Sequence, residues 1–229
     1  MLSEGAVERV ILKQDVGYCE LEGHLYFLDV SRDRYLGASA SLAATVDQLL
    51  QGGELSESSR KQLIDTGLFV DAEGRQKVLE PPCQLHSAHA ITGRSAKIFP
   101  VYTAIYRLPC AVLFLAIFHG LVGRLHLRTI IHLSQYTLRT KSIDVLPSSI
   151  EPMLYSFTQA LRLFPRKDKC LPDALALRAY LGLQGIRTTL VFGIQPSPFM
   201  AHCWIQHHDT VLGQDLEAVA DFRAIKVVP

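Results

Sequence analysis

Alternating side chains near the start of the chain predict a β-hairpin. In HLYFLDV, residues 24–30, one face of a strand carries Leu25, Phe27 and Asp29, and the other carries Tyr26, Leu28 and Val30. A turn over Ser31–Asp33 and a second strand from Arg34 complete the predicted hairpin.

Two helices and a second hairpin are predicted next. Apolar residues recur at helical spacing behind a serine cap, either Ser39 or Ser41, and a second helix is predicted over about Glu57–Thr66. The residues Asp71–Gly74 have turn composition and predict a terminal hairpin. Strands, helices and a terminal hairpin in this order predict a winged-helix-like module over residues 1–80.

A break in the pattern separates this module from the rest of the chain. Residues 81–100 are rich in Pro, Ser, Gly and His and lack periodicity, which predicts a linker. The pattern is helical over residues 101–141, and another helix is predicted from about Glu151 to Leu163. Residues 101–229 are therefore predicted to form a second domain, and the fold class is α+β.

The C-terminal 65 residues predict a helix followed by three strands. The helix starts at Cys170, where Pro172 suits a first turn, and ends at Gly185. The strands are predicted over residues 187–194, 202–207 and 210–215. In the middle strand, which contains AHCWIQHHD, the pleat places His202, Trp204 and Gln206 on one face.

Composition narrows the class of protein. A net charge of +1 and 48% hydrophobic residues give a well-supplied core and no basic surplus, so we expect no nucleic-acid partner. The five cysteines are odd in number and irregularly spaced, which predicts reduced thiols and a cytoplasmic protein. The start MLSEGAVERV has no apolar run typical of a secretory leader.

One apolar segment bears on membrane contact. Residues 108–123, LPCAVLFLAIFHGLVG, are shorter than the roughly 20 residues that cross a bilayer, so we expect no transmembrane span. A buried or partner-facing helix is the main expectation. Because Arg124 and Arg128 follow the segment, peripheral membrane contact is the alternative.

Cys170, His202 and Asp215 form a candidate catalytic triad. The positive end of a helix stabilises a thiolate, and its backbone N–H groups donate to an oxyanion. A histidine on a neighbouring strand takes and returns the thiol proton, and a carboxylate on the next strand orients the imidazole. Taken singly, the three residues also suit a buried thiol, a strand end and a turn.

Two alternatives remain for these residues. Asp209 is the rival of Asp215 for the third role, although it lies at an expected turn, and Asp221 is less suited. A zinc site would use ligands from the set Cys170, Cys203, His202, His207 and His208. Because adjacent strand residues point to opposite faces, we expect no metal.

The order of these elements resembles the papain and transglutaminase-like thiol enzymes. More closely, the chain is similar to the B proteins, the leader peptidases of lasso-peptide biosynthesis. The family's Cys-Leu helix start corresponds to Cys170-Leu171, and its G-I/V strand corresponds to Gly193-Ile194. Its H-x-W-V-E strand corresponds to residues 202–206, and its N-D pair corresponds to Gln214-Asp215. The sequence departs from the family by Gln206 for Glu, by Gln214 for Asn, and by one extra residue between His202 and Asp215.

The N-terminal module resembles the peptide-recognition element of the same pathway. In that family an extended leader peptide adds to the edge of a small sheet and packs against a helix. The corresponding surface is the strand Arg34–Gly37, with Tyr35 and Leu36 as contacts, beside the helix Glu57–Thr66. Tyr35 and Leu36 equally suit the core of the module.

The resemblance implies a cytoplasmic cysteine peptidase that removes the leader of a lasso precursor and passes the core to an asparagine-synthetase-like cyclase. It implies ATP dependence through that partner, and since the chain has no GxxxxGK[ST] motif we expect no cofactor bound by this chain. Two other functions remain open. One is another thiol acyl-transfer enzyme, a transglutaminase or amide hydrolase, and the other is a non-catalytic peptide-binding adaptor.

Overall fold

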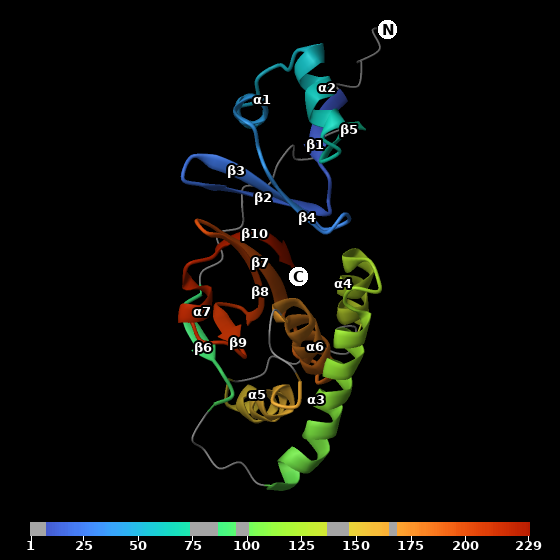
Figure 1. The fold of residues 1–229 in the computed structure, drawn as a ribbon, viewed down its shortest axis with the longest axis vertical. Helices are drawn as coiled ribbons and strands as arrows, with labels where there is room; N and C mark the ends of the chain where they lie inside the picture. The colour runs from blue at the N-terminus through green and yellow to red at the C-terminus, as the bar shows by residue number, and fades with distance from the viewer. Residues whose placement is uncertain (1–7, 74–86, 95–100, 137–146, 165–168) are drawn as a thin grey trace, which may run out of the picture. The chain divides into compact units, whose positions relative to one another are not determined.

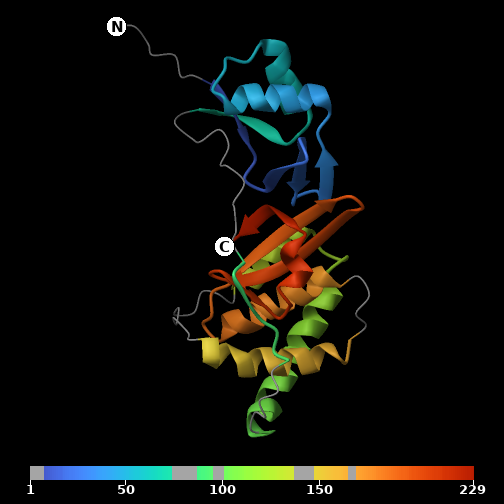
Figure 2. The same ribbon diagram turned by 90° about the vertical axis from the view of Figure 1, so that its left-hand side faces the viewer.

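The structure is a computed structural model that describes five stretches of the chain: residues 8–73, 87–94, 101–136, 147–164 and 169–229. The chain divides into two compact units, Met1–Cys83 and Gln84–Pro229. Each unit has its own sheet and its own helices (Figures 1 and 2).

The N-terminal unit contains a three-stranded antiparallel sheet in the order β2-β3-β4 and a separate antiparallel pair, β1 with β5. Its elements are β1 (Glu8–Leu12), β2 (Val16–Leu21), β3 (His24–Asp29), β4 (Arg34–Gly37), α1 (Ala40–Leu50), α2 (Glu57–Asp65) and β5 (Phe69–Glu73). The predicted β3–β4 hairpin and both predicted helices are confirmed. The winged-helix assignment stays a prediction.

The predicted turn at Asp71–Gly74 is wrong for its described part. Asp71 lies within β5 and pairs with Val10 of β1, and Glu73 pairs with Glu8. The turn-like composition was overridden by pairing with a strand about sixty residues earlier in the sequence, which local propensity does not report. The remainder of that predicted hairpin lies outside the described residues.

Side-chain caps and an aromatic core fix the helices of this unit. The hydroxyls of Ser39 and Ser56 accept hydrogen bonds from backbone N–H groups in the first turns of α1 and α2. Phe27 is fully buried and packs against Tyr18 at 6.2 Å and Phe69 at 6.0 Å between ring centroids. The core therefore joins the three-stranded sheet to β5.

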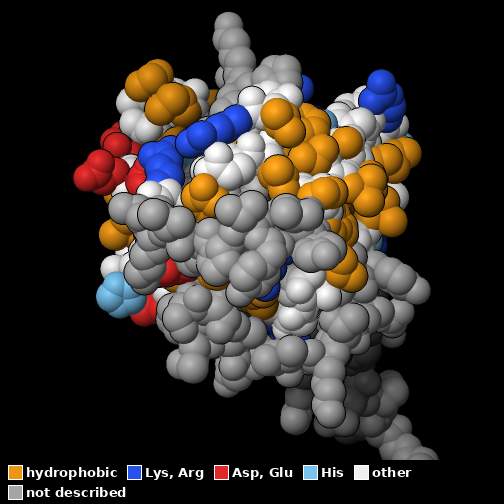
Figure 3. All heavy atoms as spheres, turned by 90° about the horizontal axis from the view of Figure 1, so that it is seen from below, with side chains coloured by type: hydrophobic (Ala, Val, Ile, Leu, Met, Phe, Trp, Pro, Cys, Tyr) orange, Lys and Arg blue, Asp and Glu red, His pale blue; other side chains and the backbone are white. Residues whose placement is uncertain are grey.

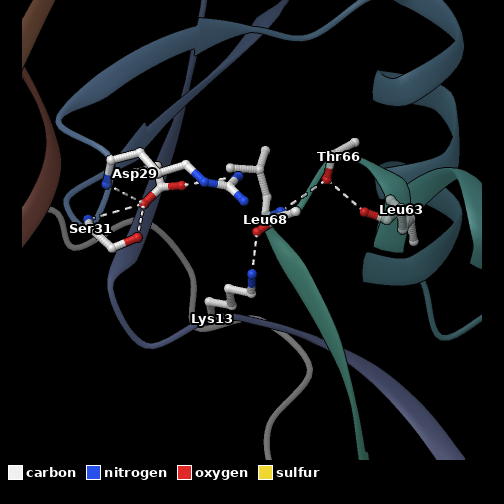
Figure 4. A network of polar contacts seen from close by, with 8 residues as sticks. Lys13, Asp29, Ser31, Leu63, Thr66 and Leu68 are labelled. Atoms are coloured by element: carbon white, nitrogen blue, oxygen red, sulfur yellow. Dashed lines mark hydrogen bonds and ion pairs between the residues drawn. The ribbon is translucent and has the colours of Figure 1, made fainter.

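Asp29 closes the β3–β4 hairpin from a buried position (Figure 4). Its carboxylate accepts hydrogen bonds from the backbone N–H groups of Ser31 and Arg32 and from the Ser31 hydroxyl. The Asp29 contacts hold the turn that precedes β4. In the same view, the Thr66 hydroxyl donates to the Leu63 carbonyl at the end of α2.

The C-terminal unit contains a five-stranded sheet in the order β10-β7-β8-β9-β6, with helices α3, α5 and α6 gathered on one side of it (Figure 2). Its elements are β6 (His89–Ile91), α3 (Val101–Leu121), α4 (Leu127–Tyr136), α5 (Pro147–Leu161), α6 (Cys170–Leu183), β7 (Thr189–Pro196), β8 (Phe199–His207), β9 (Thr210–Leu212), α7 (Glu217–Ala220) and β10 (Arg223–Val228). The helix predicted from Cys170 and the β7–β8–β9 order are confirmed.

The predicted linker contains part of this sheet. Residues 89–91 form β6, which pairs in parallel with β9, whereas the neighbouring pairs are antiparallel. Three residues are too few for a periodicity to be visible, so the strand was missed. As a result, the end of β6 lies beside Gly213, which follows β9.

The helix α6 is the buried centre of the C-terminal unit. Its residues from Ala174 to Gly182 are all buried, and it packs against α3, α4, β7 and β8. The predicted helical region 101–141 is two helices, α3 and α4, in its described part. Among the residues that the structure describes, no helix is long and apolar enough to cross a membrane.

Candidate functional site

Cys170 lies at the open start of α6. Lys169 occupies the capping position but makes no side-chain hydrogen bond to the helix, in contrast to the serine caps of α1 and α2. The first N–H groups of a helix have no acceptor within the helix. The start of α6 therefore keeps backbone donors and a positive dipole beside the thiol.

The register of β7 and β8 places His202 opposite Gly193. A Cβ atom at Gly193 would lie 2.7 Å from the Trp204 ring and 3.0 Å from Phe222, so only glycine fits there. The imidazole of His202 packs against Trp204 and Phe222, with ring centroids 6.0 and 5.1 Å away. The glycine of the Gly193-Ile194 segment is therefore explained by the space that Trp204 and Phe222 occupy.

The structure brings Cys170 and His202 together, as the sequence predicted. The Cys170 sulfur makes hydrogen bonds with the His202 side chain and with both the thiol and the backbone N–H of Cys203. Cys203 is buried, with 3% of its surface exposed, and the sequence had offered it only as a candidate zinc ligand. It is a contact of the reactive sulfur that sequence reasoning missed.

Gln214 orients the imidazole. The His202 Nε2 atom lies 2.7 Å from Gln214 Oε1, which leaves Nδ1 for the sulfur of Cys170. Gln214 follows Gly213, which has a φ of +77° and whose N–H donates to the Ile91 carbonyl of β6 at 2.8 Å. The left-handed glycine and the parallel β6–β9 pair thus position the amide that contacts His202.

Asp215, predicted to orient His202, is placed elsewhere. Its carboxylate is half-exposed and pairs with Arg94 at 3.0 Å, while the preceding residue Gln214 contacts the imidazole. The strand β9 ends at Leu212, so the next residues form a bend whose geometry the pleat does not predict. The rival Asp209 lies in the β8–β9 turn, beyond the end of the strand that carries His202.

The electrostatics favour a thiolate–imidazolium pair. Hydrogen bonds from Cys203, and then the hydrogen bond and charge of His202, lower the pKa of Cys170 to about 4, against the opposing effect of burial. Burial lowers the pKa of His202, but its bonds to Cys170 and Gln214 and the thiolate charge raise it further, so the net pKa is above the ordinary value. At neutral pH the sulfur is therefore anionic, and the raised pKa of His202 favours the protonated imidazole beside it.

Cys203 stays a neutral donor. Its bond to the Cys170 sulfur, its burial and the nearby charge of Asp173 raise the pKa of Cys203 well above its usual value. Asp173 lies in the first turn of α6 and is held by His119 of α3, with 2.7 Å between Oδ1 and Nε2. Two adjacent thiols thus have opposite protonation states, and only Cys170 is nucleophilic.

Alkylation by iodoacetamide should report this difference. We expect Cys170 to react at an almost constant rate from pH 7 down to about pH 5, and more slowly as the pH falls through its pKa of about 4, because the thiolate is then protonated. Peptide mass mapping after timed quenching gives the rate for each cysteine.

Cys110 provides the internal comparison in the same samples. Burial raises the pKa of Cys110, so its alkylation should be slow at neutral pH and increase toward alkaline pH. A Cys170 rate that increased in parallel with that of Cys110 would contradict the thiolate assignment.

The remaining predicted residues lie apart from this cluster. His207 is at the end of β8, where Nδ1 lies 2.7 Å from the Arg187 carbonyl, and His208 is in the turn. Among the described residues, no group of three or more His, Cys, Asp or Glu side chains could hold a metal ion. Arg34–Gly37 form β4 in the other unit, where β4 is an edge strand and Leu36 packs against the core.

Comparison with known families agrees with this geometry. Residues 114–227 match the family model of the transglutaminase-like superfamily, so the C-terminal half contains a transglutaminase-like domain. Cys170, His202 and Gln214 all lie within the matched region. Comparison with curated proteins and with solved structures gives no match.

Proposed function

We propose that this chain, through its transglutaminase-like domain, is a cysteine peptidase that removes the leader from a ribosomally made lasso-peptide precursor. The observation that carries the proposal is the Cys170–His202 pair at the open start of α6. The transglutaminase-like superfamily generally comprises cysteine-dependent enzymes, which supports the thiol chemistry.

In the proposed mechanism each group has its own role, supported by its contacts. The Cys170 thiolate attacks the scissile carbonyl, and N–H groups at the start of α6 donate to the oxyanion that forms. The His202 imidazolium gives its proton to the leaving amine of the core peptide, which leaves a thioester on Cys170. The neutral imidazole, held by Gln214, then activates the water that hydrolyses this thioester.

The N-terminal unit supplies an edge for the leader peptide. Within the described residues β4 pairs only with β3, so its other edge fits an added strand, and Arg34–Gly37 are the proposed contacts. Tyr35 is half-buried, and the side chain of Leu36 contributes to the core, so specificity rests more on Arg34 and Tyr35. Capture of the leader raises the effective concentration of the scissile bond at the thiolate.

The proposal includes the setting of the reaction. The freed core peptide passes to an asparagine-synthetase-like cyclase, ATP acts through that partner, and the reaction takes place in the cytoplasm. Cysteine usage without a disulfide framework supports this location.

The isotope content of the product tests the function. The full chain is incubated in H₂¹⁸O with a lasso precursor peptide, with and without an asparagine-synthetase-like cyclase. A peptidase releases a leader whose new carboxylate carries ¹⁸O, and mass spectrometry detects it. If the precursor remains intact with the cyclase and ATP present, the peptidase proposal fails.

A second candidate is acyl transfer, which the superfamily match favours because the same thioester can be resolved by an amine. In that case the leader fragment forms an amide with the amine and carries no ¹⁸O. The adaptor alternative has less support, since a purely binding domain has no need of a thiolate with a pKa of about 4.

Gln214 and Asp215 allow a matched comparison of neighbouring residues. We expect Gln214→Ala to lower the rate of leader release between about 10- and 100-fold, because the imidazole loses its orienting bond. Asp215→Ala should remain within about threefold of the parent chain, since an exposed ion pair with Arg94 contributes little. The reverse order of effects would restore Asp215 as the orienting residue.

A further inference from the structure

The charges of this chain are unevenly distributed along the sequence. Residues 81–143 contain seven Lys or Arg residues and no Asp or Glu, although the whole chain has 23 basic and 22 acidic residues. This region includes both α3 and α4. An acid-free stretch of this length in a nearly neutral chain points to an anionic partner for these helices.

The same helices expose aliphatic side chains. Leu113 and Ile117 of α3 are 57% and 43% exposed, Leu133 of α4 is 44% exposed, and Leu125 between the helices is 43% exposed. Positions 113 and 117 are one helical turn apart, so they form a stripe along α3. Figure 3 shows hydrophobic side chains gathered on the side where α3 and α4 lie, with basic side chains beside them.

Exposed cations lie where α3 and α4 meet in the sequence. Arg124 follows α3 at its end, where its guanidinium donates to the Gly120 carbonyl, and Arg128 is exposed in the first turn of α4. His126 and His132 are also exposed. Aliphatic side chains with basic residues at their border are the pattern of a helix lying in the headgroup region of an anionic bilayer.

We propose that the surface formed by Leu113, Ile117, Leu125 and Leu133 with Arg124 and Arg128 docks the protein on an anionic lipid surface. The aliphatic side chains enter the acyl boundary and the guanidinium groups contact lipid phosphates. The opposite side of α3 packs against α5 and α6, and no described helix can cross a membrane, so α3 lies along the surface. Nucleic acid suits this surface less, because the exposed leucines have no counterpart on a phosphate backbone.

Vesicle sedimentation with the full chain tests this docking. The probes are vesicles of phosphatidylcholine alone and vesicles of phosphatidylcholine mixed with phosphatidylglycerol. We expect binding to the mixed vesicles only, and a marked decrease as the salt concentration rises. A Leu113→Ser/Arg124→Glu double variant should bind at least about tenfold more weakly.

A matched variant of the other unit is the control. Leu50→Ser/Lys61→Glu changes an equally exposed leucine, at 45%, and an exposed lysine, and should bind like the parent chain. Cys170→Ala should also bind fully, which separates this proposal from the peptidase proposal. The docking proposal is overturned if the parent chain stays in the supernatant, or if the Leu113→Ser/Arg124→Glu variant instead loses only its complex with the cyclase, which would assign the surface to a protein partner.

Discussion

A Cys170→Ala variant is expected to release leader peptide at least about 10³-fold more slowly than the parent chain. The reason is that the thiol next to Cys170 cannot replace the lost nucleophile. Cys203 is adjacent but buried, and its bond to Cys170, its burial and the charge of Asp173 raise its pKa well above the usual value. Leader release is measured by mass spectrometry with enzyme in excess over precursor, so that slow turnover is still detected.

Three companion variants make this result specific. Cys170→Ser keeps nearly the size of the side chain and should be similarly inactive, and a circular dichroism spectrum like that of the parent chain excludes a loss through misfolding. Cys110→Ala should retain the parent rate. Cys203→Ala should retain the nucleophile but lose a hydrogen bond that lowers the pKa of Cys170, so its pH profile should move upward. Undiminished cleavage by Cys170→Ala would place the nucleophile elsewhere in the chain.

The proximity of Cys170 and His202 in the candidate site could be predicted because each residue lies on a regular element. A helix start stabilises a thiolate whatever the rest of the fold, so the proline-containing start at Cys170 was informative once it was combined with the histidine strand that follows. The period of two along β8 separated His202 from Cys203 and His207, and the structure places His207 at the end of the strand and His208 in the turn. On a regular helix or strand, the direction of a side chain can be predicted from its position in the sequence pattern.

The orienting group could not be predicted in the same way. Gln214 and Asp215 follow β9 in a bend that depends on the positive φ of Gly213 and on a hydrogen bond to Ile91 of β6. Chemical preference selected the carboxylate, but the bend directs the amide toward the imidazole and the carboxylate toward Arg94. Because the sequence predicts a linker where β6 lies, the hydrogen bond from Gly213 to β6 could not be predicted.

Long-range pairing limited the prediction of the N-terminal unit as well. The β3–β4 hairpin and the capped helices depend on residues close in sequence, and they were predicted at nearly their observed bounds. In contrast, β5 is a strand because β1 pairs with it, and its Asp71 and Glu73 would favour a turn in isolation. In this unit the prediction therefore failed where a strand depends on a partner far away in the sequence, and it succeeded where the interacting residues are close in sequence.

A His202→Ala variant is expected to lower the rate of leader release by between about 10² and 10⁴-fold. In the proposed mechanism the imidazolium both stabilises the thiolate and protonates the leaving amine, so its loss affects the ground state and the transition state. The pKa of Cys170 should rise above about 4, because the hydrogen bond and the charge of His202 are among the causes that lower it, while the bonds from Cys203 remain. The pH profile of iodoacetamide alkylation, measured on the same samples, should move upward accordingly.

His207→Ala is the matched control for this variant, since it removes another imidazole from β8. Among the described hydrogen bonds, the His207 ring contacts only the Arg187 carbonyl. His207→Ala should cleave at nearly the parent rate. Added imidazole should partly restore cleavage by His202→Ala, because the space between Trp204 and Phe222 that the ring occupied is then open. A His202→Ala variant that kept both the parent cleavage rate and the low pKa of Cys170 would show that Cys203 and the start of α6 alone activate the thiol.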